Sequence, residues 1–358
     1  IKECDWSSDV CSSDLMLRGF LKILIGFTGV FFGSAQDLHF SQFDLAPLVL
    51  NPAQAGVHHD FRGVANYRDQ WSSVGGNGFK TIGVSSDFSL LKEAGRPFWM
   101  GSGISVYNDK AGVGQLSTLR ADLSFAACVP SGKNVYSGGL QFGYTQKSVY
   151  MGDFSWDSQF NGFVYDAALP TMEYYNNPSF GYFTTAAGAN WYYSRTEHYM
   201  TSNDELKANM GLSIHYFNSP RQSFKDLTNE NLFTKWMFYG NYSVGLHGKN
   251  ICFLPSYYFY FQGPSRAWMI GSLVKYIVTE ASHFTHIKKA CAIAVGGSYR
   301  SGDALMLQSL FEYDRYAIGF AYDMTTSRLK TANNTFGGLE VNFRFNTSRA
   351  PGTSKSRI

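Results

Sequence analysis

Residues 119–128 read LRADLSFAAC, and apolar side chains occupy every second position of this stretch. The intervening positions hold arginine, aspartate, serine, alanine and cysteine. Because successive side chains of a strand point to opposite faces, the pattern predicts a strand with one apolar and one mostly polar face. Residues 207–217 (KANMGLSIHYF) and 338–345 (GLEVNFRF) alternate in the same way.

About fourteen segments of this kind follow residue 58, separated by turn-forming residues. We expect strands near 60–70, 78–89, 98–107, 115–128, 134–148, 182–195, 206–217, 233–247, 250–262, 265–279, 288–300, 303–313, 314–323 and 335–346. Long connections at 149–181, 218–232 and 324–334 share one parity, whereas tight turns at 130–133 and 312–315 share the other. An even strand count with this asymmetry predicts an all-β fold, a single transmembrane antiparallel β-barrel with both termini in the periplasm.

Composition agrees with a barrel in an outer membrane. Only 16% of the 358 residues are charged, 17% are aromatic, and no stretch after the signal-like segment has the roughly 18 apolar residues of a spanning helix. A soluble β-sandwich would explain part of this composition, but not the long connections at one end only. The net charge of +3, without basic runs, argues against nucleic acid as a partner.

The chain divides into five expected parts. Residues 1–15, which precede Met16, are expected to be a non-native, adapter-like leader. Residues 16–35 have the basic start, apolar centre and small-residue end of a Sec signal peptide. We expect a periplasmic N-terminal segment over 36–58, the barrel over 59–346, and a disordered basic tail over 347–358.

Aromatic residues concentrate at the expected strand ends, where tyrosine and tryptophan favour the membrane interface. We therefore assign them to two aromatic girdles. The residues concerned include Tyr67, Trp71, Tyr107, Tyr136, Trp236, Tyr257, Tyr258 and Trp268.

Several motifs together resemble one family. They are NPAQAG at 51–56, YRDQW at 67–71, GSYRSGDA at 297–304 and GGLE at 337–340. The order and spacing of these motifs resemble the PorP/SprF family of type IX secretion membrane proteins over roughly residues 38–346. The resemblance implies an outer-membrane barrel of Bacteroidota that takes part in protein secretion or gliding motility.

Several classes of partner follow from this resemblance. The resemblance implies a secreted adhesin, other components of the type IX system, or a peptidoglycan-binding protein with an OmpA-like domain, besides the outer-membrane lipid. The alternative function is a channel or uptake barrel for small or apolar solutes.

The motif at 51–56 is a candidate partner-binding site. Pro52 restricts its own backbone and that of Asn51, and Gly56 permits a positive φ. The plainest interpretation is a rigid turn leading into the barrel. The functional interpretations are a periplasmic docking site or a plug folded into the lumen.

A second candidate site lies at the rim of the lumen. Strand alternation directs Arg68 and Gln70 inward and Trp71 outward, and Arg300 and Asp323 also point inward near the same rim. Buried charges of this kind need partners. They either form a structural network that rigidifies the rim or hold a segment of a partner protein.

The third candidate is the long connection at 149–181, which contains Trp156, Tyr174 and Tyr175 among other aromatic residues. So much apolar area in a surface loop predicts either a lid over the barrel mouth or a partner-binding surface. We expect no enzymatic activity, metal or cofactor, because no nucleophile pairs with a base. The histidine pairs 58–59 and 283/286 also lack further ligands at metal-site spacing.

Overall fold

The computed structural model describes residues 39–72, 78–92, 96–112, 116–150, 156–172, 179–195, 198–199, 202–203, 205–224, 231–280, 288–327, 330–333 and 335–347. The expected leader and signal peptide at 1–15 and 16–35 lie outside these residues, as does the expected basic tail at 347–358 except for Thr347, which belongs to a strand. The described residues belong to one compact unit. No helix in the described part is long and apolar enough to cross a membrane.

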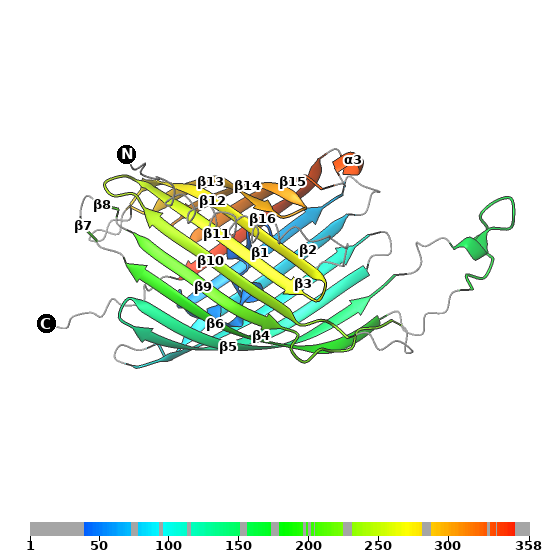
Figure 1. Ribbon diagram of the computed structural model, residues 1–358, viewed down its shortest axis with the longest axis horizontal. Helices are drawn as coiled ribbons and strands as arrows, with labels where there is room; N and C mark the ends of the chain where they lie inside the picture. The colour runs from blue at the N-terminus through cyan, green and yellow to red at the C-terminus, as the bar shows by residue number, and fades with distance from the viewer. Residues whose placement is uncertain are drawn as a thin grey trace, which may run out of the picture. The chain divides into compact units, whose positions relative to one another are not determined.

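Fourteen antiparallel strands close into a barrel (Figure 1). They are β1 (Phe61–Gln70), β2 (Phe79–Leu90), β3 (Trp99–Ala111), β4 (Leu116–Ser131), β5 (Asn134–Ser148), β6 (Ser179–Arg195), β9 (Leu206–His215), β10 (Lys235–Gly245), β11 (Ile251–Gln262), β12 (Ser265–Thr279), β13 (Cys291–Arg300), β14 (Ala304–Tyr313), β15 (Tyr316–Thr325) and β16 (Phe336–Thr347). All fourteen predicted strands are confirmed, and two-residue strands β7 (His198–Tyr199) and β8 (Ser202–Asn203) lie between β6 and β9.

The barrel closes where β1 pairs with β16. Ten consecutive residue pairs join the two strands, from Phe61 opposite Thr347 to Gln70 opposite Gly338. We call the end with the connections 149–178 and 216–234 the loop end, and the end with the turns 132–133 and 314–315 the turn end. Strand β1 runs from the turn end to the loop end.

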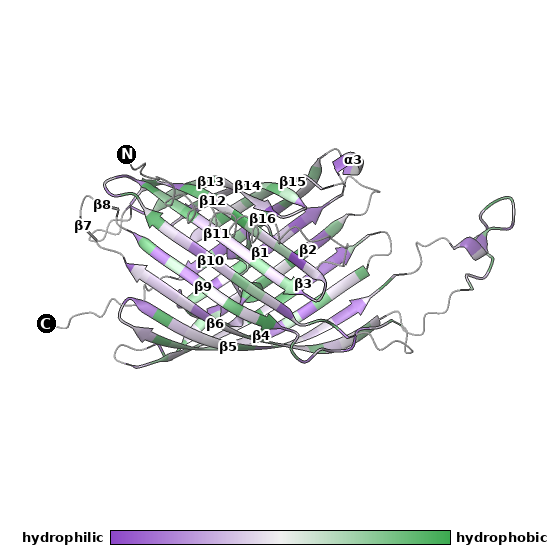
Figure 2. Ribbon diagram, viewed as in Figure 1, coloured by the Kyte–Doolittle hydropathy of each residue, from purple (hydrophilic) through white to green (hydrophobic). Residues whose placement is uncertain are grey.

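Side chains alternate across the wall as predicted. In β4 the leucines and Phe125 are exposed on the outside, whereas Arg120, Asp122 and Ser124 are buried inside. The same alternation recurs around the wall, so that hydrophobic residues are spread over the strands among polar ones (Figure 2). This apolar outer surface with a polar interior is the arrangement that a transmembrane barrel requires.

The apolar core of the protein lies inside the barrel, around residues 39–57. This segment, which we call the plug, contains η1 (Phe43–Leu45), α2 (Pro47–Leu50) and η2 (Pro52–Gln54). Each of the four buried apolar clusters joins plug residues to wall residues. Of the segment expected in the periplasm over 36–58, residues 39–57 lie within the lumen, where hydrogen bonds and apolar packing hold them.

Two predicted girdle residues also face the lumen instead. Tyr107 and Tyr258 are buried, and their rings lie 5.9 and 5.6 Å from those of Phe40 and Phe43 in the plug. Position at a strand end thus did not distinguish an outward aromatic from one that packs on the plug. Tyr67 does point outward, as expected.

The connection between β5 and β6 contains a small self-ordered hairpin at the loop end (Figure 1). It includes η3 (Asp157–Gln159) and a bridge between Phe160 and Tyr165. The Asn161 side-chain oxygen accepts bonds of 3.0 Å from two backbone N–H groups in the turn. A further short helix, α3 (Lys330–Asn333), lies in the connection before β16.

Candidate functional site

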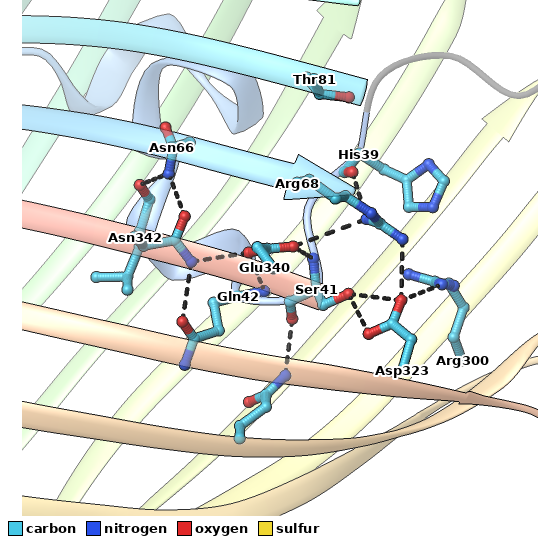
Figure 3. Close-up of polar contacts among 12 residues, drawn as sticks. His39, Ser41, Gln42, Asn66, Arg68, Thr81, Arg300, Asp323, Glu340 and Asn342 are labelled. Atoms are coloured by element: carbon cyan, nitrogen blue, oxygen red, sulfur yellow. Dashed lines mark hydrogen bonds and ion pairs between the residues drawn. The ribbon is translucent and has the colours of Figure 1, made fainter. Parts of the chain in front are cut away.

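The plug runs through the lumen from the loop end to the turn end. His39 lies beside Arg68 near the loop end of β1, and the Arg68 guanidinium donates a 2.6 Å bond to its carbonyl oxygen (Figure 3). At the other end, Asp60 pairs with the last residue of β16, Thr347. The chain therefore crosses the barrel interior before it enters the wall.

A charged cluster surrounds the loop-end part of the plug (Figure 3). Arg68 and Arg300 each approach the same Asp323 carboxylate oxygen to 2.9 Å. Arg300 also contacts Asp303 at 2.7 Å, and Arg68 lies 3.8 Å from Glu340. All five side chains are nearly inaccessible to water. The barrel thus pairs its buried charges, as a low-dielectric interior demands.

The cluster binds the main chain of the plug directly. The Glu340 carboxylate accepts the backbone N–H groups of Ser41 and Gln42 at 2.6 and 3.0 Å. The Ser41 hydroxyl donates to Asp323 at 2.7 Å, and Gln308 donates to the Ser41 carbonyl at 2.8 Å. Hydrogen bonds to ionised groups are stronger than neutral ones, so this contact fixes the loop-end part of the plug.

The Gln42 side chain is bound as completely as its backbone. Its amide nitrogen donates to the carbonyl oxygens of Ser309 and Phe320 at 3.1 and 3.3 Å. Its amide oxygen accepts from Asn342 at 2.9 Å. Asn342 is itself held by Glu340 at 2.8 Å. One hydrogen-bond network therefore binds two successive residues of the plug, Ser41 and Gln42.

The 51–56 motif anchors the turn-end half of the plug. The Asn51 amide donates to the carbonyl oxygens of Ala189 and Leu212 and to the Tyr239 hydroxyl, at 2.9–3.2 Å. Its oxygen caps η2 by accepting from the Ala53 N–H at 2.8 Å. Asn51 is fully buried. The interpretation of the motif as a lumenal plug is therefore the one that the structure supports.

Gly56 ends the motif in the left-handed conformation, with φ of +63°. A Cβ there would lie 2.6 Å from the Phe88 carbonyl oxygen, so no other residue fits this close approach. The Gly56 N–H donates to Asp87 at 2.9 Å, and Trp99 donates to its carbonyl at 2.9 Å. Asp87 also pairs with Arg62 at 2.7 Å.

Comparison with known proteins identifies the family. The family model described as "Type IX secretion system membrane protein PorP/SprF" matches residues 32–345. The chain belongs to the PorP/SprF family. This PorP/SprF chain is an outer-membrane β-barrel of the type IX secretion system, as the motifs had suggested.

Several solved membrane proteins are distantly similar to this PorP/SprF barrel. The outer membrane protein Omp33 of Acinetobacter baumannii is 11% identical, with 81% of this chain and 99% of that chain covered and a TM-score of 0.38. The translocator domain of the autotransporter NalP from Neisseria meningitidis is 10% identical, with 94% and 96% covered and a TM-score of 0.38. The toluene transporter TbuX of Ralstonia pickettii is 10% identical, with 88% and 96% covered and a TM-score of 0.43. No curated protein matches the chain.

The structure brings some predicted site residues of this PorP/SprF barrel together and keeps others apart. Arg68, Arg300 and Asp323 form one cluster, as their shared parity predicted, and Gln70 is buried at the end of the same strand. Trp71 follows β1 and packs edge-on against Phe79, with ring centroids 5.3 Å apart.

The motif residues Asn51, Pro52 and Gly56 contact other strands of the wall and not this cluster. Trp156 belongs to the loop-end hairpin, and Tyr174 and Tyr175 lie outside the described residues.

Sequence reasoning missed the plug residues Ser41 and Gln42 and their carboxylate partner Glu340. Glu340 did carry a signal, because strand alternation puts this charge on the inner face of β16. Nothing in the pattern of 39–43 shows that the wall would bind it. Among the described residues, no group of three His, Cys, Asp or Glu side chains could hold a metal ion.

Proposed function

We propose that this PorP/SprF barrel is a closed protein-binding barrel that anchors a secreted surface protein, such as an adhesin, at its loop end. The observation that carries the proposal is the plug. Residues 39–57 contact strands all around the wall, from β1 through β10 to β16, and bury apolar side chains in every cluster. A filled lumen argues against the alternative of a channel or uptake barrel for small or apolar solutes.

The loop-end hairpin supports a protein partner. Phe163 at its tip is 92% exposed, and Phe160, Val164, Tyr165 and Met172 are each more than half exposed. The hairpin is ordered by its own hydrogen bonds and needs no support from the wall. A fixed, exposed apolar surface of this kind is typical of an interaction site.

We further propose that the loop end faces outside the cell and the turn end faces the periplasm, in line with the usual asymmetry of outer-membrane barrels. The barrel would reach the membrane through the Sec signal peptide at 16–35. A second candidate function is linkage to periplasmic machinery, including an OmpA-like, peptidoglycan-binding partner. The turn-end connections at 91–98 and 280–290 favour this candidate, because they are longer than the tight turns at 132–133 and 314–315.

Deletion of residues 156–176 tests the adhesin proposal. The deletion should leave the barrel inserted, because it removes none of the hydrogen-bonded wall, and it should release the adhesin into the medium. Phe163→Ser should release adhesin too, whereas Phe98→Ser, at an exposed phenylalanine of the turn end, is the matched control. Normal surface attachment in the deletion variant would refute anchoring through this loop. A steady ion current from the wild-type barrel in planar bilayers would instead favour the channel.

A further inference from the structure

The loop-end part of the plug is bound in the manner of a peptide ligand. Three wall side chains form hydrogen bonds with its main chain. Glu340 accepts from two N–H groups, Arg68 donates to the His39 carbonyl, and Gln308 donates to the Ser41 carbonyl. Any polypeptide whose backbone follows the same path would make these contacts, because they do not depend on its side chains.

Two further contacts select side chains. Asp323 accepts the Ser41 hydroxyl through both of its oxygens, at 2.7 and 2.9 Å. The Gln42 amide meets two carbonyl acceptors and one amide donor, so each of its polar atoms is matched. The network therefore discriminates a hydroxyl residue followed by a carboxamide residue, as Ser-Gln or Thr-Asn would provide. A buried site of this kind rejects a segment that leaves its polar groups unpaired.

Two separate groups of contacts hold the plug. Those at 39–42 lie at the loop end, whereas the Asn51 and Gly56 contacts hold the plug further along the lumen. Residues 39–43 could therefore detach while the rest of the plug stays in place. One donor is left over in the site, since Nη1 of the buried Arg300 has no hydrogen-bond partner. A ligand could satisfy it with a carbonyl or carboxylate oxygen.

We propose that this charged cluster is a peptide-binding site that residues 39–43 occupy in cis, and that a segment of a partner protein with the same hydroxyl-amide chemistry binds there in their place. The inference rests on the proposed function and deepens it, because it states which kind of segment the barrel holds. The segment enters from the loop end, where Arg68 donates to the His39 carbonyl. The site carries two guanidinium groups against three carboxyl groups, Asp303, Asp323 and Glu340, so it favours a segment without added acidic residues beside the Ser-Gln pair.

A peptide of residues 37–46 (DLHFSQFDLA) tests the proposal on the full chain. Asp37→Cys carries a fluorophore, in a background where alanine replaces Cys128, Cys252 and Cys291. Added peptide should displace the cis segment and raise the mobility of the fluorophore, with half-maximal effect at roughly millimolar peptide, because the tethered segment competes at a similar effective concentration. The same peptide with Ser41→Ala and Gln42→Ala should be at least about tenfold weaker.

Substitutions in the wall test whether the peptide binds at the charged cluster. Glu340→Gln removes the carboxylate that accepts both N–H groups and should weaken the peptide at least about tenfold. Glu312→Gln is the matched control, because Glu312 pairs with Lys275 and Arg344 away from the site. If both peptides act alike, or neither acts at roughly ten times the expected millimolar midpoint, the segment is a fixed structural plug and the proposal fails.

A second variant tests peptide binding without competition from the cis segment. A barrel lacking residues 36–46 should bind the labelled peptide at least about tenfold more tightly than the full chain does, and should still migrate as a folded barrel on unheated gels. If it migrates as folded and fails to bind, the proposal is refuted. If this barrel does not fold, the full-chain measurement decides alone. If the peptide binds but deletion of the loop does not release the adhesin, the proposed anchoring is refuted and the peptide site is supported.

Discussion

Gly139→Ala should loosen the plug without altering the outer wall. Gly139 faces the lumen in β5, and a Cβ at this position would lie 2.5 Å from the Ala53 nitrogen and 2.7 Å from the Pro52 carbonyl carbon. Real Cβ atoms do not approach backbone so closely, so either the plug or the strand must move. Overpacking of this kind costs about 1–3 kcal/mol.

The neighbouring glycine supplies a matched control. Gly138 points outward, and a Cβ there meets nothing within 4 Å. Alanine restricts the unfolded strand at both positions by a similar amount, about 0.5–1 kcal/mol relative to glycine, so this effect cancels in the comparison. The remaining difference of about 1–3 kcal/mol corresponds to a ratio of docked to undocked plug that is about 5- to 150-fold lower for Gly139→Ala.

Single-molecule current recordings in planar bilayers measure this ratio, because even rare openings are counted. We expect brief openings to be about 5- to 150-fold more frequent in Gly139→Ala than in Gly138→Ala. Both variants should shift from folded to unfolded migration on gels at similar temperatures. Equal opening frequencies in the two variants would show that the plug does not rest against Gly139, and the account of a filled lumen would then be wrong.

Three further predictions concern the plug and its junction with β1. Asn51→Asp removes the amide donor and should raise the frequency of openings, since the lost bonds cost about 2–3 kcal/mol; unchanged recordings would contradict the anchoring role of the motif. Asp87→Ala leaves Arg62 buried without its partner and should destabilise the barrel by about 3–5 kcal/mol in heat-dependent gel migration, whereas an unshifted midpoint would argue against the pair. Burial, together with the positive charge of Arg62, lowers the pKa of His59 to about 3. The unfolded state therefore binds the proton first, and stability should fall as the pH drops from about 6.5 toward 3, with a weaker pH dependence in His59→Gln.

The wall of the barrel was predictable from sequence because a strand has a strict period of two. Lipid outside and polar groups inside impose opposite requirements on successive residues, so residues such as Arg120 and Leu123 reveal their faces directly. The same rule assigned Arg68, Arg300 and Asp323 to the lumen. It also placed them near the same rim, but it could not give the contacts among them, which depend on β1, β16, β15 and β13 lying close together in the closed wall.

A lumenal plug was one interpretation of the 51–56 motif, but its course and its contacts escaped prediction for a related physical reason. Residues 39–57 have no regular period, since short helical turns alternate with irregular backbone. Several of their hydrogen bonds go to wall residues more than 100 positions away, as for Ser41 with Asp323 and Asn51 with Leu212. Glycines in the wall are a further local signal. Gly139 and Gly188 leave room for the plug backbone and the Asn51 side chain, yet strand glycines also occur at bulges and at tight bends of a barrel wall.

The plug also changes how stability and function are connected in this barrel. In a water-filled barrel the wall would be held mainly by its strand ladder and by lipid, but here all four buried apolar clusters need the plug. Detachment of the whole plug would therefore expose most of the core to water. Release of residues 39–43 alone exposes mainly Phe40 and Phe43, while the core around Leu48 and Val57 stays closed. An exchange confined to the loop-end segment would let the barrel take up a partner segment without opening a continuous path across the membrane.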